Sequence, residues 1–173
     1  MKEKETVIRK AELKDKEEIC EIQKRVIKEK CSENYTSEQV EALLLVSSKI
    51  KWVETSIDSE IDYFYVAERN NRVVGFGVLF MNLQYHRLEN TEPISSLQNI
   101  CINPDYSGQG VGHSLLLFLE NIAKENKCSV IYVSALFNCI HFLQKMGYQI
   151  KEKSFIFNRR GIVVECFGME KLL

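Results

Sequence analysis

The sequence predicts one α/β (α+β) domain spanning residues 1–173, with a mixed central sheet of about six to seven strands and about four flanking helices. Strand-like runs alternate with amphipathic helical patterns. The segment 96–134 has the order strand, glycine turn, helix, strand, which makes a parallel βαβ unit. Hairpin patterns elsewhere require antiparallel neighbours. With two prolines, no linker-like stretch and 45% apolar residues, the chain is expected to bury a single core.

The N-terminal third predicts one strand and two helices. Residues 6–11 (TVIRKA) have strand character, and residues 12–30 carry apolar side chains at helical spacing. After a polar connection containing CSENY, a second helical pattern covers residues 36–53, and Thr36 or Ser37 is placed to cap its start. We therefore expect one continuous helix in that second segment.

The middle of the chain predicts a hairpin and a further strand. Two β-rich runs, residues 62–68 and 72–81, are separated by the tripeptide RNN. Asn70 and Asn71 tolerate the positive φ that a tight hairpin turn demands, so this is the clearest hairpin in the chain. Residues 94–102 (ISSLQNICI) are expected to form the strand that leads into the glycine turn.

The C-terminal third continues the alternation after the long helix that follows the glycine turn. Residues 129–135 predict a buried strand, and residues 138–146 predict a short helix that ends at Gly147. Residues 148–158 and 161–172 predict a last pair of strands around RRG. Such an apolar late strand leaves a homodimer open.

Charge and hydropathy exclude several classes of function. The 23 basic and 24 acidic residues nearly cancel, so nothing favours nucleic acid or an anionic membrane as the main partner. No stretch approaches the roughly 20 apolar residues of a membrane span, and the N-terminus has no apolar signal core. We therefore expect a cytoplasmic protein.

The cysteines predict neither a disulfide framework nor a metal site. None is arranged as C-x-x-C, and they do not alternate with the three histidines at ligand spacing. We expect reduced thiols that pack as small apolar residues, and no bound metal. Cys101 lies beside the glycine turn, but no nearby base is evident to make it a nucleophile.

The glycine turn is the main chemical signal in the sequence. Gly108, Gly110 and Gly112 alternate just before an apolar helical series. Free backbone N–H groups and the helix dipole favour an anion at such a helix start, and glycine lets a ligand approach the backbone. The spacing fits neither a Walker loop nor a dinucleotide fingerprint. From these residues alone, a phosphate cradle and a simple tight turn both stay open.

The run ICINPDYSGQGVGHSLLLFLENIAKE, followed by SVIYVSA and NCIHFLQKMGYQ, resembles the signature of the GNAT acyltransferase superfamily. That signature is a strand, an R/Q-x-x-G-x-G/A loop, a helix, a strand and a short aromatic helix ending in K-x-G-F/Y. The resemblance is sharp over about residues 96–150. It implies the GNAT fold, acetyl-CoA or a related acyl-CoA as donor, and transfer of the acetyl group to a primary amine by direct attack in a ternary complex.

The resemblance also implies which residues bind the donor. The pyrophosphate would lie on the N–H groups of the loop, and the pantetheine arm would pair with the strand before it, with the Ile100 N–H holding the thioester oxygen. His113 would touch a phosphate or stay exposed. Asn138 would contact the pantetheine or the adenosine phosphates, or cap its helix. The implied cofactor-binding residues are Ile100, Cys101, Ile102, Ser107, Gly108, Gln109, Gly110, Val111, Gly112, His113 and Asn138.

Two positions depart from the family pattern. Ser107 stands where the loop usually begins with Arg or Gln, which removes a polar side chain but leaves the backbone groups. Leu143 stands where many members carry a Tyr that protonates the departing thiolate. A catalytically silent acyl-CoA-binding regulatory module of the same fold is therefore the alternative to an enzyme, and an interaction domain with a mere turn is a third possibility.

The general base and the acceptor site are less defined. Glu92 is the first candidate base, with Ile100 as the other catalytic residue, while Glu89, Ser96, Gln98 and His86 are further candidates. In the connection CSENY, Glu33 and Tyr35 place a carboxylate beside an aromatic ring, which suits a primary amine. A polyamine, an amino sugar, an amino acid and a protein amine all fit, and so does a purely structural connection.

Overall fold

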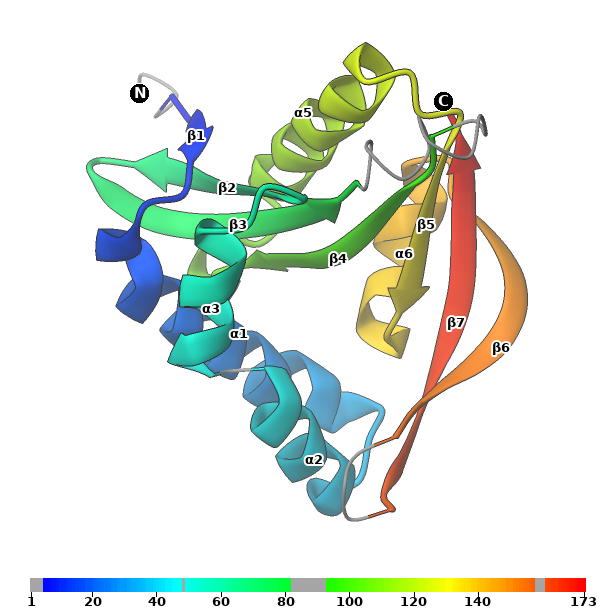
Figure 1. Cartoon of the computed structure of the whole chain (residues 1–173). Helices are drawn as coiled ribbons and strands as arrows, with labels where there is room; N and C mark the ends of the chain where they lie inside the picture. Colours follow the sequence, from blue (N-terminus) through cyan, green and yellow to red (C-terminus); the bar gives the residue numbers. More distant parts are fainter. Residues whose placement is uncertain (1–4, 48, 82–92, 158–160) are drawn as a thin grey trace.

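The computed structural model describes residues 5–47, 49–81, 93–157 and 161–173, and in them a seven-stranded sheet has the order β1-β2-β3-β4-β5-β7-β6 (Figure 1). Every pair of neighbouring strands is antiparallel except β4 and β5, which are parallel. The mixed sheet and the βαβ unit are therefore confirmed. The strands are β1 (Val7–Lys10), β2 (Asp62–Arg69), β3 (Arg72–Phe80), β4 (Ser95–Ile102), β5 (Val130–Ala135), β6 (Gln149–Phe157) and β7 (Val163–Leu172).

Helices cover both faces of the sheet. On one face, Phe76 of β3 and Cys101 of β4 pack with Ile19 of the first helix. On the other face, Ile100 packs with Leu115 of the helix that follows the glycine turn. Neighbouring residues of a strand point to opposite faces, so the two helices sandwich β3 and β4. The helices are α1 (Lys16–Lys30), α2 (Ser37–Ser47), α3 (Ile50–Ile57), α5 (Val111–Glu125) and α6 (Phe137–Lys145), with 3₁₀ turns η1 (Leu13–Asp15), η2 (Cys31–Glu33) and η3 (Pro104–Tyr106).

The prediction of one continuous helix over residues 36–53 is wrong, because the chain forms α2 and α3 there. Lys49, at the N-terminus of α3, has extended backbone angles (φ −94, ψ 125) that interrupt the helix. Val53 of α3 joins the cluster around β2 and β3, whereas Leu43 of α2 joins a separate cluster with Val164 of β7. Dividing the segment into two helices lets each helix pack on its own cluster. This break explains why the described residues form five α-helices rather than about four.

The turn predictions are confirmed. Asn70 and Asn71 have φ values of 51° and 58° and connect β2 to β3, as the hairpin requires. Gly147 has a φ of 91° just after α6, where a left-handed residue commonly ends a helix. No helix in the described part of the chain is long and apolar enough to cross a membrane.

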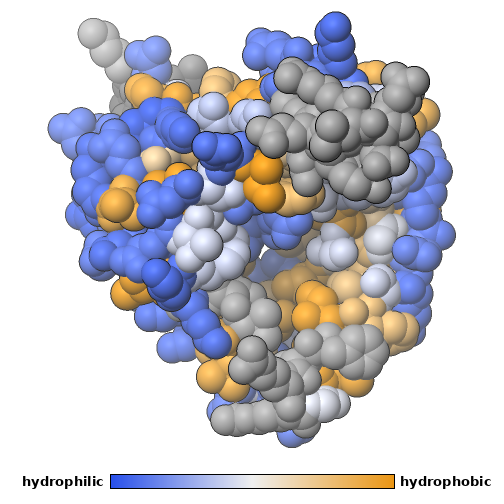
Figure 2. All heavy atoms as spheres, in the orientation of Figure 1, coloured by the Kyte–Doolittle hydropathy of each residue, from blue (hydrophilic) through white to orange (hydrophobic). Residues whose placement is uncertain are grey.

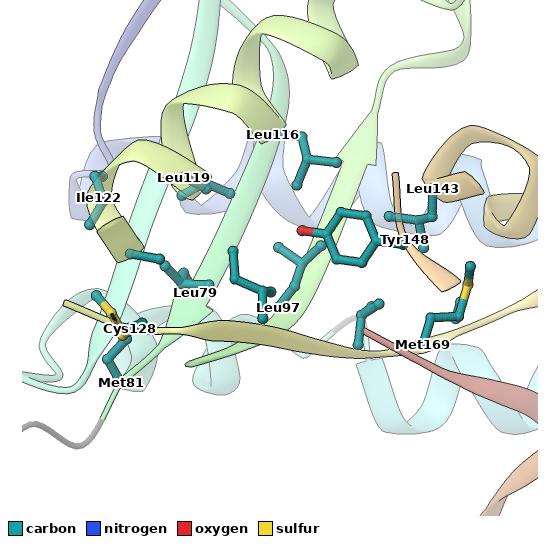
Figure 3. Packing of buried hydrophobic residues seen from close by; sticks show 14 residues of the cluster. Leu79, Met81, Leu97, Leu116, Leu119, Ile122, Cys128, Leu143, Tyr148 and Met169 are labelled. Atoms are coloured by element: carbon teal, nitrogen blue, oxygen red, sulfur yellow. Dashed lines mark hydrogen bonds between the residues drawn. The ribbon is translucent and has the colours of Figure 1, made fainter. Parts of the chain in front are cut away.

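The largest core cluster lies between the sheet and the helices α5 and α6 (Figure 3). Leu116 and Leu119 of α5 face Leu79 of β3 and Leu97 of β4 in this view. A Cβ on Gly77 of β3 would lie 2.6 Å from Leu119 Cδ1, so the missing side chain lets α5 approach the sheet closely. This packing sets the start of α5 beside the C-terminal end of β4.

Candidate active site

The strands β4 and β5 separate part of the way along their length (Figure 1). They pair in parallel only from Ser95 to Leu97, opposite Ile131 to Val133. β4 nevertheless continues to pair with β3 as far as Ile102. From Gln98 onward, the side of β4 that faces β5 therefore has no strand partner in the described part of the sheet, and a gap opens there.

The backbone of β4 presents hydrogen-bonding groups to this gap. The Asn103 N–H donates to the Val74 carbonyl at 2.9 Å, which makes Asn103 a residue bonded to β3. Bonded and non-bonded residues alternate along an antiparallel pair, so Cys101 also bonds to β3. The N–H and C=O groups of Ile100 and Ile102 therefore point away from β3 and into the gap. The Ile100 N–H is thus available to an oxygen atom there.

The glycine loop forms a cluster of N–H groups next to the gap. Gly108 and Gly110 have φ values of 74° and 79°, and a Cβ at either position would meet nothing within 4 Å. Glycine is therefore required by the backbone and leaves the space in front of it open. Gly110 is the N-cap of α5, so the N–H groups of Val111, Gly112 and His113 lie in its first turn, where no intrahelical acceptor exists. Together with the helix dipole, they favour an anion.

Two arginines from different elements, α1 and β2, bond to the loop. Arg25 of α1 donates to Asn103 Oδ1 at 3.0 Å and, with both terminal nitrogens, to the Asp105 carboxylate at 2.9 and 3.1 Å. Arg69 at the end of β2 donates to the side-chain and backbone oxygens of Gln109 at 2.9 and 3.1 Å. Sequence reasoning missed both arginines, because their partners are distant in the chain.

A cavity of about 560 Å³ extends from the glycine loop to α6, and we call it the outer cavity. Its wall includes Glu33 of η2 as well as residues of the glycine loop, β4 and α6, so it brings together most of the predicted site residues. Gln109 and Val111 are outside the wall: the Gln109 side chain bonds to Arg69, and Val111 is buried in the core. The predicted cofactor-binding residues in the wall are Ile100, Cys101, Ile102, Ser107, Gly108, Gly110, Gly112, His113 and Asn138.

A second cavity of about 150 Å³, the inner cavity, lies on the other side of the gap, between α1 and the separated strands. The two cavities meet at β4, α1 and α6, because they share five wall residues: Val26, Ile100, Cys101, Asn138 and Cys139. In Figure 2 the molecule is hollowed between the α1 and α2 side and the β7 side, and hydrophobic residues border the hollow on the β7 side. The site therefore consists of two adjoining cavities that share part of their walls.

Tyr35 lies outside the walls of both cavities. It is only 8% exposed, and its hydroxyl donates to the Glu165 carbonyl at 2.7 Å and accepts from the Phe137 N–H at 3.1 Å. Burial raises the pKa of Tyr35 to about 12. Its hydroxyl therefore satisfies the first N–H of α6 and ties that helix to β7, which makes Tyr35 a positioning residue.

Asn138 and Leu143 occupy different places on α6. The N-cap of α6 is Leu136, so the interpretation of Asn138 as the cap is wrong. The Asn138 Oδ1 accepts a hydrogen bond from the Cys31 thiol at 3.6 Å, and Asn138 lines both cavities. Leu143 is 1% exposed, packs in the core and borders the inner cavity. No acid group stands at its position to protonate a leaving group.

The thiols near the gap are not activated. Burial raises the pKa of Cys101, raises that of Cys139 to about 11 and raises that of Cys31 to about 12. All six cysteines are free, and five of them are buried, as expected for thiols that pack as apolar residues. The described residues contain no group of three or more metal-ligating side chains arranged to hold a metal ion.

The candidate bases are only partly described. Glu92, Glu89 and His86 lie outside the described residues. Ser96 lies in the part of β4 that pairs with β5, and Gln98 borders the inner cavity where the strands separate. Neither side chain is a base at neutral pH.

A family model described as the acetyltransferase (GNAT) family matches residues 26–148. No curated protein sequence matches the chain.

Solved structures share the fold at low sequence identity. A GCN5-related N-acetyltransferase from Rhodopseudomonas palustris has a TM-score of 0.84 at 21% identity, over 100% of this chain and 99% of that one. The PaiA N-acetyltransferase of Thermoplasma acidophilum, solved in complex with coenzyme A, has a TM-score of 0.77 at 19% identity, over 98% and 99%. A GNAT-family acetyltransferase of Streptococcus pneumoniae has a TM-score of 0.67 at 22% identity, over 98% and 100%.

Proposed function

The chain belongs to the acetyltransferase (GNAT) family, and on that premise we propose that it transfers an acetyl group from acetyl-CoA to a primary amine. The observation that carries the proposal is the meeting of two backbone features in one cavity. The N–H cluster at the start of α5 suits a pyrophosphate, and the unpaired side of β4 suits the amide groups of a pantetheine arm. The coenzyme A bound to the Thermoplasma relative supports the same ligand here.

The proposed reaction is a direct transfer at the Ile100 end of the gap. The amine nitrogen attacks the thioester carbonyl carbon, and the carbonyl oxygen gains negative charge beside the Ile100 N–H. The intermediate then collapses as the C–S bond breaks: the nitrogen loses its second proton to water, the CoA thiolate leaves and the neutral amide remains. Glu92 is the proposed base that takes the proton of the ammonium group, directly or through water.

The proposed enzyme has no general acid at the Leu143 position. A thiol has an ordinary pKa of about 8.5, so a thiolate is a tolerable leaving group near neutral pH and can take its proton from water. The silent acyl-CoA-binding module keeps its place as the alternative, because Leu143 removes the one acid that the resemblance implies. The predicted cytoplasmic location and homodimer stay part of the proposal.

Two measurements on the purified chain test the proposal. Calorimetric titration with acetyl-CoA is expected to give a saturable dissociation constant, and the absence of binding would contradict both the enzyme and the silent module. Free thiol released from acetyl-CoA with a panel of amines then separates the two. Glu92→Gln is expected to abolish that release while leaving the dissociation constant of acetyl-CoA unchanged, and a Glu92→Gln variant with full activity would remove Glu92 as the base.

A further inference from the structure

Gln23 of α1 has a hydrogen-bonding oxygen with no partner. The residue is 2% exposed, and among the described residues nothing donates to its Oε1 atom. Buried side-chain oxygens are nearly always paired, because an unsatisfied acceptor loses the hydrogen bonds it had with water. Gln23 borders a cavity, so its unpaired amide oxygen can accept a hydrogen bond from a donor that a ligand or a water molecule brings there.

The position of Gln23 indicates which ligand brings that donor. Gln23 borders the inner cavity and not the outer one, which holds the glycine loop. With the pyrophosphate at that loop and the thioester at Ile100, the donor molecule occupies the outer cavity, so the attacking group must approach from the inner one. The acyl group has no N–H or O–H to offer, whereas a primary amine does.

The wall of the inner cavity is neutral. It combines apolar side chains, including Ile27, Leu43 and Val133, with uncharged amides, and none of the described residues that form it is an Asp, Glu, Lys, Arg or His. A second charged group on the acceptor would lose its hydration there without gaining a partner. The volume of about 150 Å³ is also below the roughly 300–1,000 Å³ of sites for drug-sized ligands.

We propose that the inner cavity takes a primary amine on a small apolar body, and that the Gln23 amide oxygen accepts a hydrogen bond from its amino group. This inference rests on the proposed function, because it assigns the acceptor of the same transfer. It makes Gln23 a residue that touches the substrate and sets its class. Glu33, in the wall of the outer cavity, then lies on the donor side of the gap.

The first test is Gln23→Met, which keeps the length of the side chain and removes the oxygen. We expect kcat/KM for the amine to fall at least about five-fold, with an unchanged dissociation constant for acetyl-CoA. We also expect Tm to stay the same or rise, because the variant removes an unsatisfied buried acceptor. A glutamine with a purely structural role gives the opposite pattern, a lower Tm with unchanged kinetics, and that result would overturn the inference.

The matched control is Gln144→Met, which makes the same change on the exposed side of α6. It is expected to change neither Tm nor kcat/KM. If Gln144→Met lowers kcat/KM as much as Gln23→Met does, the effect of Gln23 is not local and the inference fails. Failure of acetyl-CoA to bind the wild-type chain instead contradicts the proposed function, and the inference falls with it.

The second test compares three amines with the same four-carbon chain: n-butylamine, 1,4-diaminobutane and 4-aminobutanoate. They differ only in the far group, which is a methyl, an ammonium or a carboxylate. We expect n-butylamine to have a kcat/KM at least about ten-fold above the other two, because the apolar wall cannot hydrate the second charge. A preference for either charged amine, or equal rates for all three, would overturn the assigned substrate class.

Discussion

The outer and inner cavities meet at β4 but are built from different kinds of groups. The outer cavity offers backbone N–H groups, from the first turn of α5 and from the side of β4 that faces the gap, and its wall also includes the charged residues Lys30, Glu33 and Lys145. The inner cavity is formed by side chains from α1, α2, β4, β5, α6 and β6. A backbone cradle depends on a few glycines in one short segment, whereas a side-chain wall depends on residues spread over the whole chain. Substitutions can therefore change the side-chain wall, and with it the substrate, without changing the backbone cradle.

The largest expected effect is at Ile100, where the two cavities join. Ile100→Pro removes an N–H that points into the gap and is not used to pair with β3. We expect kcat to fall about 10²–10³-fold, as when one oxyanion donor is lost. We also expect Tm to fall, because the packing of the Ile100 side chain on the core is lost, but by less than in the control variant.

The control for that variant is the next residue along the strand. Cys101→Pro removes an N–H that bonds to β3, so we expect a large loss of Tm and little folded protein. The measurements are thermal unfolding and single-turnover rates. An active Ile100→Pro variant would show that another group holds the thioester oxygen.

A loss of stability is expected at the start of α1, the helix that lines both cavities. Asp15 has a 5% exposed side chain and pairs with Arg9 at 2.7 Å. Asp15→Asn removes one of the two carboxylates that pair with Arg9, which keeps Glu68 at 2.8 Å, and is expected to lower the free energy of unfolding by about 1–2 kcal/mol. Because α1 contributes to both walls, we expect the affinity for acetyl-CoA to fall and the KM for the amine to rise in the same variant. A change in only one of these two quantities would show that α1 does not couple the two cavities, which would contradict the prediction.

The same carboxylate predicts a loss of stability in acid. Burial alone would raise the pKa of Asp15, but hydrogen bonds from Arg9 and the Glu12 N–H and the charge of Arg9 outweigh it, so the net pKa is lowered. The stabilisation is present above the ordinary pKa of Asp and is lost as the pH falls through the lowered folded-state value. Urea unfolding as a function of pH should therefore have a shallower acid slope in Asp15→Asn. Equal slopes in the two proteins would contradict the assignment.

A smaller effect is expected from the backbone cradle. Gly110→Ala and Gly161→Ala both place a Cβ on a residue with φ near 79° or 75°, in open space. Each is expected to lose about 1–2 kcal/mol of stability from the left-handed backbone. Only Gly110→Ala is expected to weaken acetyl-CoA binding, by about ten-fold or more, in calorimetric titration. Equal affinities in the two variants would mean that the loop does not contact the donor.

The smallest expected effect is at Tyr35, which supports the inner wall without lining it. Tyr35→Phe removes the bonds to the Glu165 carbonyl and the Phe137 N–H and is expected to cost about 1–2 kcal/mol of stability. Because the ring stays in place, we expect the amine KM to change less than two-fold. A large rise in KM with an unchanged Tm would restore Tyr35 as a substrate-binding residue.

The difference between the cavities also explains what could be predicted from the sequence. Hydrophobic periodicity and turn residues predict the strands and the hairpin at Asn70. The glycines alone leave a cradle and a tight turn both open, and the outer cradle is implied only by the resemblance to the GNAT signature. Periodicity does not predict the break at Lys49, because apolar residues occur throughout both halves of the pattern and only packing on separate clusters divides them. Sequence patterns do not predict the contacts of Arg25 and Arg69, because their partners are 40 or more residues away in the sequence. The role of Gln23 cannot be predicted from the sequence, because only the folded structure shows that its oxygen has no hydrogen-bond partner.

The most direct measurement of the central claim is an amide ¹H–¹⁵N titration of the chain with acetyl-CoA. If backbone N–H groups hold the donor, saturable shifts should be largest from Gly108 to His113 and at Ile100 and Ile102, while Gly161 stays unshifted as a remote reference. No saturable shift at the loop and at β4, or shifts confined to other parts of the chain, would contradict the claim that this cavity is built by backbone groups for acetyl-CoA.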